Sequence, residues 1–246
     1  MLGFYSRRSG TGIRFFSCMA SVTTGSACMG TDNGFSATTT VCSCRTRGLM
    51  ELVEVKSPAM EIKERYDISR WFNWIEENSH PHCVFGFGES MGAGQLLQSL
   101  PSESRFCAVI AESPFETFRE VSYARFGRPF HTGPWLGRTF FWPTDEVGFL
   151  FVRLAYGLNM DAVSPREAVR QSAVPVFLIH GTADRNIPPY NSEDIQRANP
   201  AKVRLWEVRG AAHCGAHEVA PDEFDHKVLD WLSQHSAGNA NTSHFD

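Results

Sequence analysis

The chain has 246 residues, 42% of them hydrophobic, which is enough for one sizeable α/β domain and too little for two. Its formal net charge of -4 excludes the basic face that nucleic acids or anionic lipids require, so the expected partner is a small molecule or another protein. No stretch reaches the about 18 to 20 apolar residues of a membrane-spanning helix, because Arg153 interrupts the nearest one.

The seven cysteines are odd in number and show no repeated pair spacing, which favours a reducing compartment, the cytoplasm, over a disulfide framework. Cys42 and Cys44 are separated by one residue, whereas zinc-binding pairs are separated by about two to four. No matching Cys/His pair follows them, so no metal site is expected. The first residues carry arginines but no continuous apolar run, and no signal peptide is expected.

The first sixty residues are predicted to be an irregular segment. Residues 17 to 46 are crowded with Ser, Thr, Cys, Gly and Ala and show no clear period. Within them, the stretch ATTTVCSC has the Thr and Val content that a strand favours.

Regular elements are predicted from residue 61 onward. Apolar residues first recur at the i, i+3, i+4, i+7 spacing of one helix face, which predicts an amphipathic helix that ends near Asn78. They are Ile68, Trp71, Phe72 and Ile75. The short apolar segments at residues 83 to 87 and 107 to 112 predict two buried strands, with a helix from about residue 91 to 100 between them.

A second helix start is marked by Ser164 as the cap, Pro165 at the first helical position and Glu167 three residues after the cap. The apolar segments VPVFLIH, at residues 174 to 180, and KVRLWEV, at residues 202 to 208, predict two further strands.

The last helix is predicted within residues 221 to 234, where four apolar residues share one face. They are Phe224, Val228, Trp231 and Leu232. The tail, residues 235 to 246, is small and polar and is expected to be disordered.

Short apolar strands that alternate with helices predict an α/β fold with a mostly parallel sheet covered on both faces. Ligands bind at the carboxyl ends of the strands in such sheets, so a functional residue should lie just after a strand.

Ser90 meets this criterion. The segment GESMG at residues 88 to 92 fits the pattern G-x-S-x-G between a strand and a helix, which is a nucleophile elbow. Glycines are needed because the turn is strained and side chains there would collide with backbone. The N–H of Met91 can then face a developing oxyanion at the helix N-terminus. The competing interpretation is a glycine-rich packing turn with an idle serine.

A catalytic serine needs an acid and a base, and candidates for both follow later strands. Asp184 lies in the loop after residues 174 to 180, and His213 lies in the loop after residues 202 to 208. The chain order Ser, Asp, His is the order that accompanies a nucleophile elbow. Asp184 would hold the imidazole in its useful tautomer, and His213 would take the serine proton and return it to the leaving group.

Other interpretations of these residues exist. Asp184 would only cap the following turn in one of them. His217 competes with His213 as the base, and we prefer His213 because it follows the strand after two small residues. A structural role is expected for His180, which precedes the turn glycine. Cys214 is expected to be a small packing residue and not a second nucleophile.

From about residue 61 to residue 232 the chain resembles the α/β-hydrolase superfamily, in particular bacterial serine aminopeptidase-like and prolyl-oligopeptidase-like serine hydrolases. The motifs that carry the resemblance are GFGESMGAG, AVIAESPF, SPREAV, VPVFLIHGTADRNIP and GAAHCGAHEVAPDEFDHKVLDWL. It implies an α/β-hydrolase core over residues 61 to 234. It also implies hydrolysis of an ester, thioester or amide in a small acyl substrate or short peptide, through an acyl-serine, with no cofactor. The alternative is a non-catalytic binding module or pseudoenzyme with this fold.

The resemblance also implies that the N-terminal strands are incomplete. Family members precede the helix at residue 61 with further strands, one ending in a His-Gly turn that supplies the second oxyanion donor. No such segment precedes residue 61 here, so we expect a truncated chain with impaired activity. Residues 41 to 61, read in a shifted frame, can yield a strand and loop like those of the family. We therefore prefer a frameshifted or misassigned start to a genuine extension.

An aromatic-rich insert, about residues 113 to 163, separates the second and third strands. In this family such inserts lie over the carboxyl ends of the strands, which implies a cap with an apolar acyl pocket. The alternative is that the aromatic residues form the insert's own small core, and we expect both to be partly true. A membrane-facing role is weaker, because charged residues and a proline break the segment. They are Arg128, Arg138, Pro143 and Asp145.

Overall fold

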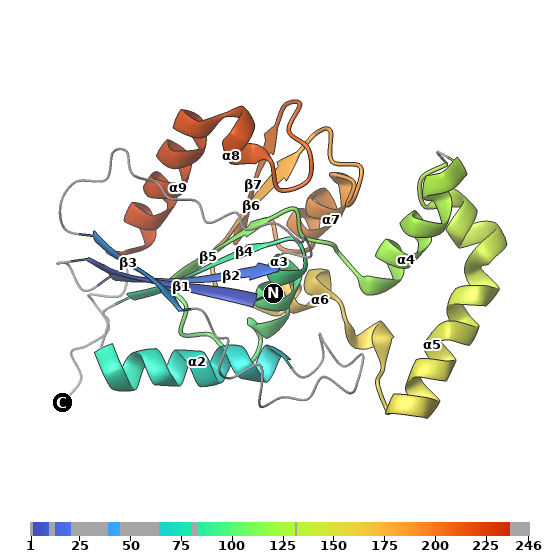
Figure 1. Ribbon diagram of the computed structural model, residues 1–246, viewed down its shortest axis with the longest axis horizontal. Coiled ribbons are helices and arrows are strands. Elements are labelled where there is room, and N and C mark those ends of the chain that lie inside the picture. Colours follow the sequence, from blue (N-terminus) through green and yellow to red (C-terminus); the bar gives the residue numbers. More distant parts are fainter. Residues whose placement is uncertain are drawn as a thin grey trace.

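The computed structural model describes residues 2–9, 13–20, 39–44, 64–79, 83–130 and 132–236. The strands of this described part form a single seven-stranded sheet in the order β3-β1-β2-β4-β5-β6-β7 (Figure 1). Their bounds are β1 Leu2–Ser9, β2 Ile13–Ala20, β3 Thr39–Cys44, β4 Cys83–Glu89, β5 Ala108–Glu112, β6 Val176–Gly181 and β7 Val203–Val208. Strands β2, β4, β5, β6 and β7 run parallel, and β1 pairs antiparallel with β2 and β3.

Helices cover both faces of this sheet, with α2 on one side and α9 on the other (Figure 1). The helices are α2 Glu64–Ser79, α3 Met91–Ser99, α4 Phe118–Gly127, α5 Trp142–Tyr156, α6 Pro165–Arg170, α7 Tyr190–Ala198, α8 Ala216–Val219 and α9 Pro221–Ser236. The predicted α/β fold with a mostly parallel sheet is therefore confirmed. The cap predicted for α6 is also present, because Ser164 Oγ accepts the N–H of Glu167 at 3.2 Å.

The core lies on the two faces of the central strands. Neighbouring residues on a strand point to opposite faces, so Val109 packs into the cluster with α2, α3 and α6, whereas Ile110 packs into the cluster with α9. Leu178 and Ile179 divide in the same way on β6. Since both faces are covered, these strands are mostly apolar and show no polar alternation.

The N-terminal part differs from the irregular segment that the sequence predicted. β3 falls within ATTTVCSC, where Thr and Val favoured a strand, but β1 and β2 were not predicted. β2 runs alongside β4 from the pair Ile13↔Cys83 to the pair Met19↔Glu89. This pairing joins segments about seventy residues apart, which no local pattern in residues 13 to 20 reveals. The division into domain units and the frameshift remain predictions.

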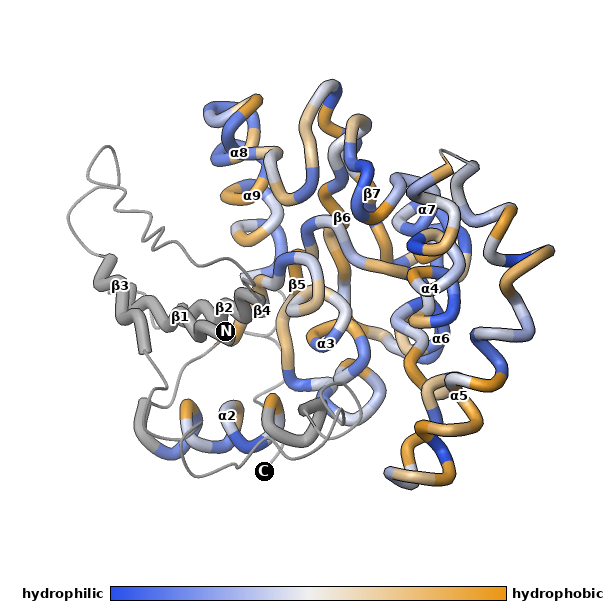
Figure 2. The backbone as a smooth tube through the Cα atoms, turned by 45° about the vertical axis from the view of Figure 1, so that its right-hand side comes forward, coloured by the Kyte–Doolittle hydropathy of each residue, from blue (hydrophilic) through white to orange (hydrophobic). Residues whose placement is uncertain are grey.

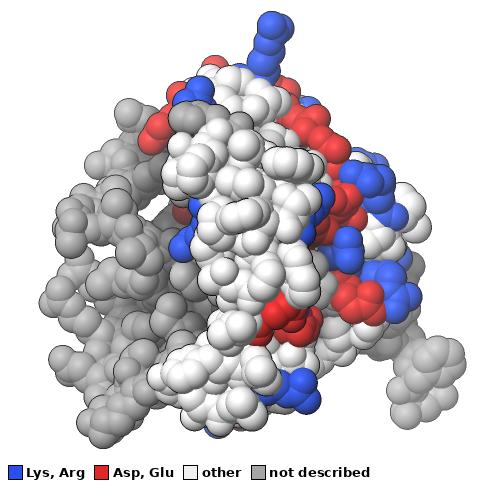
Figure 3. Space-filling view, turned by 90° about the vertical axis from the view of Figure 1, so that its right-hand side faces the viewer, with Lys and Arg blue, Asp and Glu red and all other residues white. Residues whose placement is uncertain are grey.

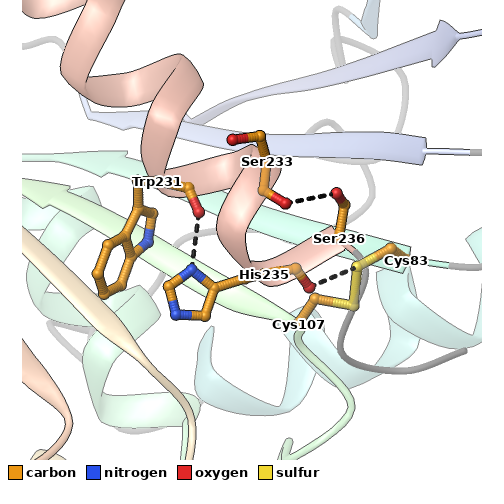
Figure 4. The surroundings of a disulfide bond; sticks show 6 residues. All are labelled: Cys83, Cys107, Trp231, Ser233, His235 and Ser236. Atoms are coloured by element: carbon orange, nitrogen blue, oxygen red, sulfur yellow. Dashed lines mark hydrogen bonds between the residues drawn. A yellow bond between two sulfur atoms is a disulfide. The ribbon is translucent and has the colours of Figure 1, made fainter. Parts of the chain in front are cut away.

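One disulfide, between Cys83 and Cys107, corrects the expectation of reduced cysteines. Cys83 begins β4 and Cys107 precedes β5, and because neighbouring parallel strands start at the same edge, their Cα atoms lie 5.8 Å apart. The carbonyl oxygen of His235, at the end of α9, lies 3.8 Å from Cys83 Sγ (Figure 4). Disulfides persist mainly in oxidising compartments, and the cytoplasmic location remains a prediction from the cysteine count.

The insert extends from the carboxyl edge of the sheet and carries α4 and α5 (Figure 1). Part of it forms the small core that the sequence allowed: Phe126 stacks on Phe141 with ring centroids 5.1 Å apart. Asp145 is buried, and Arg138 pairs with Glu120 while its side chain stays half exposed. None of the helices in the described ranges has the length and hydrophobicity needed to span a bilayer.

Candidate active site

Ser90 occupies a strained turn between β4 and α3. Its backbone has φ 51° and ψ -118°, a conformation that residues with a Cβ rarely adopt. A Cβ at Gly88 would lie 2.7 Å from the carbonyl oxygen of Gly92, which explains the glycine at that position. The turn is fixed on both sides, because Ser90 N–H donates to the Glu112 carbonyl at 2.8 Å and Gly94 N–H donates to the Ser90 carbonyl at 3.1 Å.

The structure brings the three predicted side chains into one line. His213 Nε2 lies 2.7 Å from Ser90 Oγ, and His213 Nδ1 lies 2.7 Å from Asp184 Oδ2. The three residues follow β4, β6 and β7, whose carboxyl ends share one edge of the sheet. In this arrangement Ser90 can donate its proton to Nε2 while Nδ1–H donates to Asp184.

Asp184 makes the contacts of both interpretations that the sequence left open. Its Oδ1 accepts the N–H groups of Asn186 at 2.8 Å and Ile187 at 3.0 Å, which caps the turn, and its Oδ2 faces His213. Burial alone would raise its pKa, but hydrogen bonds from His180, His213 and Ile187 outweigh it and hold the pKa below its ordinary range. The carboxyl is therefore ionised at neutral pH and can stabilise a positive charge on His213.

The other two histidines do not contact Ser90. His180 is fully buried, with Nδ1 2.6 Å from Ser192 Oγ and Nε2 2.8 Å from the Ile187 carbonyl and 3.4 Å from Asp184 Oδ2, in agreement with a structural role. His217 packs its ring edge against Phe224 and lies 3.7 Å from Asp225, on the α9 side. The structure thus places His213, and not His217, against Ser90.

Sequence reasoning missed Glu112 and Ser113, at the carboxyl end of β5. Both are buried, and Glu112 Oε1 accepts the N–H of Ala216 at 3.0 Å. Ser113 has φ 50°, and its Oγ accepts the N–H of Cys214 at 3.3 Å. The criterion of lying just after a strand would have found them, but AVIAE was read only as a buried strand.

Burial is the largest cause of the pKa shifts of three groups near Ser90 and His213. It raises the pKa of Glu112 to about 7, helped by the neighbouring Glu89 and Asp184, whereas Ala216 N–H and His213 lower it. Burial is also the main cause that raises the pKa of the Glu89 carboxyl. Burial raises the pKa of the Cys214 thiol as well, so this thiol stays protonated and is a poor nucleophile, as expected.

The first candidate oxyanion donor is the N–H of Met91, which begins α3 directly after Ser90. The first N–H groups of a helix have no partner within the helix, and its dipole favours negative charge there. The loop after β2, beside the Ser90 strand, lies outside the described residues. Among the residues described, no group of three His, Cys, Asp or Glu side chains is arranged to hold a metal ion.

A sequence model described as the Alpha/beta hydrolase family matches residues 61–226. Among curated proteins, none matches the sequence of this chain. The fold is similar to that of the esterase Pf2001 of Pyrococcus furiosus, with a TM-score of 0.54 and 21% identity over 74% of this chain and 66% of that one.

Two further solved structures are similar. The acylaminoacyl peptidase of Pyrococcus horikoshii gives a TM-score of 0.53 at 15% identity, over 74% of this chain and 29% of that one. Est1E from Butyrivibrio proteoclasticus gives a TM-score of 0.51 at 18% identity, over 72% of this chain and 71% of that one. These identities show a common fold and nothing finer. The chain spans less than two thirds of the Pf2001 esterase, 62% in one crystal form and 66% in another.

Proposed function

This chain belongs to the alpha/beta hydrolase family, and we propose that it is a serine hydrolase that cleaves an ester, thioester or amide through an acyl-serine intermediate. The observation that carries the proposal is the line Ser90, His213, Asp184, with 2.7 Å at each contact. Nucleophile, base and orienting acid within hydrogen-bond reach of one another are the requirement for activating a serine.

The reaction follows from these contacts. His213 Nε2 takes the Ser90 proton while Oγ attacks the substrate carbonyl, and the oxyanion that forms accepts the N–H of Met91. The bond to the leaving group then breaks, and His213 gives it the proton. Water, deprotonated by His213, releases the acyl group and restores Ser90. Throughout, the ionised Asp184 holds Nδ1–H and stabilises the imidazolium.

We expect the rate to be lower than that of a family member with two oxyanion donors. The prediction rests on the second oxyanion donor, for which the sequence shows no His-Gly segment before residue 61. Loss of one such donor lowers kcat by about a hundred- to a thousand-fold. Ser90 and His213 do not depend on that donor for their geometry, so weak turnover through the same acyl-serine intermediate is the expected behaviour.

We propose a small acyl substrate or short peptide with an apolar acyl group. Support comes from the apolar cluster of Phe115, Val163 and Ile187, since the N–H of Ile187 itself binds Asp184. This cluster lies where the insert leaves the sheet, beside the candidate site. Esters of medium chain length are therefore expected to react faster than acetate, and equal rates would contradict an apolar acyl site.

Hydrolysis of p-nitrophenyl acetate, butyrate and octanoate tests the proposal, with the wild type compared with Ser90→Ala. Ser233→Ala is the matched control, because the hydroxyl of this exposed serine donates to the Asp230 carbonyl on α9. Turnover that is lost in Ser90→Ala and kept in Ser233→Ala supports the proposal. Absence of turnover in the folded wild type would favour the non-catalytic alternative.

A further inference from the structure

The α5 helix carries an exposed apolar stripe. Val147, Leu150, Phe151 and Leu154 follow the i, i+3, i+4, i+7 spacing of one helix face, and their exposed fractions lie between 55% and 77%. A globular protein normally turns such a stripe towards its core. Figure 2 shows that much of α5 is hydrophobic although it lies at the periphery, and Figure 3 shows a broad surface without charge on that side.

Three aromatic residues that precede the stripe in the chain are also exposed, and we call them together with the stripe the α5 face. They are Trp135, Phe140 and Trp142, with exposed fractions of 64%, 73% and 49%. Together the seven side chains expose on the order of 800 to 1,000 Å² of apolar surface, and a standard protein interface buries about 800 Å² on each partner. An uncharged surface of this size marks an interaction site.

We propose that the α5 face is the interface of a homodimer with two-fold symmetry. The stripe is symmetric in sequence about residues 150 and 151. Two antiparallel copies of α5 therefore place Val147 against the partner's Leu154, and Leu150 against the partner's Phe151. A two-fold interface requires this kind of self-complementary surface, and the spacing is that of helices packed along an apolar seam.

Charge favours a second copy over an anionic membrane or a charged partner. Residues 113 to 163 contain five arginines, five carboxylates and no lysine. Two of these arginines are used internally: Arg119 pairs with Glu146 and Asp161, and Arg138 pairs with Glu120. Helices that bind membrane surfaces usually carry lysine and arginine on their polar face, and α5 has little of either to offer.

Light scattering after size-exclusion chromatography tests the dimer. The wild type is expected at twice the 27.5 kDa mass of the chain, and Leu154→Glu at the single mass. Because Leu154 is 77% exposed, this variant should keep its fold, which circular dichroism checks. Leu229→Glu, at an exposed leucine on α9, is the control and should stay dimeric.

Three results would overturn the proposal: a wild type of single mass across micromolar concentrations, a Leu154→Glu variant that stays dimeric, or loss of the dimer in both variants. A monomer that binds neutral phosphatidylcholine vesicles through this face would assign it to a lipid surface instead.

A second inference rests on different contacts and on the proposed function. We infer that the Glu112 side chain is a positioning residue for His213. Its carboxyl accepts the N–H of Ala216, three residues after His213. Because Cys214, directly after His213, has φ 52°, the loop needs such an external hold.

Two substitutions of Glu112 show whether its side chain acts as a hydrogen-bond acceptor or through its negative charge. Glu112→Gln keeps an oxygen that can accept the Ala216 N–H, and kcat is expected to stay within about threefold of the wild type. Glu112→Ala leaves that buried N–H unpaired, and kcat is expected to fall about ten- to a hundred-fold with KM little changed, because the misplaced base acts on the chemical step.

Equal kcat for Glu112→Ala and the wild type would overturn this inference, as would a folded Glu112→Gln variant as impaired as Glu112→Ala. If Glu112→Ala fails to fold, the kcat of Glu112→Gln still tests the inference, because it should stay near the wild-type value. An inactive wild type would instead reject the proposed function itself.

Discussion

Gly181 controls the position of the candidate base, and Gly181→Ala tests this directly. A Cβ at this position, the last of β6, would lie 2.2 Å from the carbonyl oxygen of Ala211 and 2.7 Å from that of Ala212. Ordinary contacts begin at 3.4 Å, so the backbone at Ala211 and Ala212, directly before His213, must move by about 1 Å. A misplacement of that size costs about a hundred-fold in rate, which corresponds to about 2.7 kcal/mol of transition-state stabilisation.

The assay is kcat/KM for p-nitrophenyl butyrate, with the melting temperature measured on the same samples. The movement also strains the hydrogen bond from Ala183 N–H to the Ala211 carbonyl, at 2.9 Å, so a stability loss of about 1 to 3 kcal/mol is expected. Gly148→Ala is the control, because a Cβ there meets no atom within 4 Å, and it should keep full activity. A Gly181→Ala variant with wild-type kcat/KM would refute the reasoning.

Three further predictions follow from the site and its surroundings. Asp184→Asn should lower kcat about ten thousand-fold because it disturbs the His213 tautomer, and ester hydrolysis near the wild-type rate would contradict this. Glu112 has a folded pKa of about 7 against 4.5 as its ordinary value, so its favourable effect on stability is full below about pH 4.5 and is lost as the pH rises through 7. Urea unfolding should therefore show the wild type losing about 3 kcal/mol relative to Glu112→Gln between pH 4.5 and 8, and a constant difference would show that Glu112 does not titrate in this way. Reduction of the Cys83–Cys107 disulfide, which spans 24 residues, should lower the free energy of unfolding by roughly 3 kcal/mol, and a Cys83→Ser variant should not respond to the reductant.

The sequence could predict that the three candidate residues lie close together, because parallel strands end at one edge of a sheet. A residue placed just after a strand must lie near others placed in the same way, and Ser90, Asp184 and His213 satisfied this rule. The same rule applied to the end of β5 would have identified Glu112. It was overlooked because a strand that is apolar for four residues and ends in glutamate reads as core, and the partner of the carboxyl is a backbone N–H in a distant loop.

Features that depend on non-local pairing could not be predicted from local pattern. β2 is defined by its ladder with β4, and the Cys83–Cys107 bond by the common starting edge of β4 and β5. The exposed face of the α5 helix could not be predicted from the sequence either. Its residues are apolar on most sides, so periodicity does not reveal that Leu154 points outward while Phe149 packs against Phe118.

The most direct test of the central claim is covalent labelling of Ser90. The folded chain is treated with a fluorophosphonate, digested and analysed by mass spectrometry, beside Ser90→Ala and His213→Ala. We predict one adduct on the peptide that contains Ser90, its absence in Ser90→Ala, and labelling slowed by orders of magnitude in His213→Ala, because the base activates the serine. No adduct on Ser90 of the folded wild type, or equal labelling without His213, would contradict the assignment of this chain as a serine hydrolase.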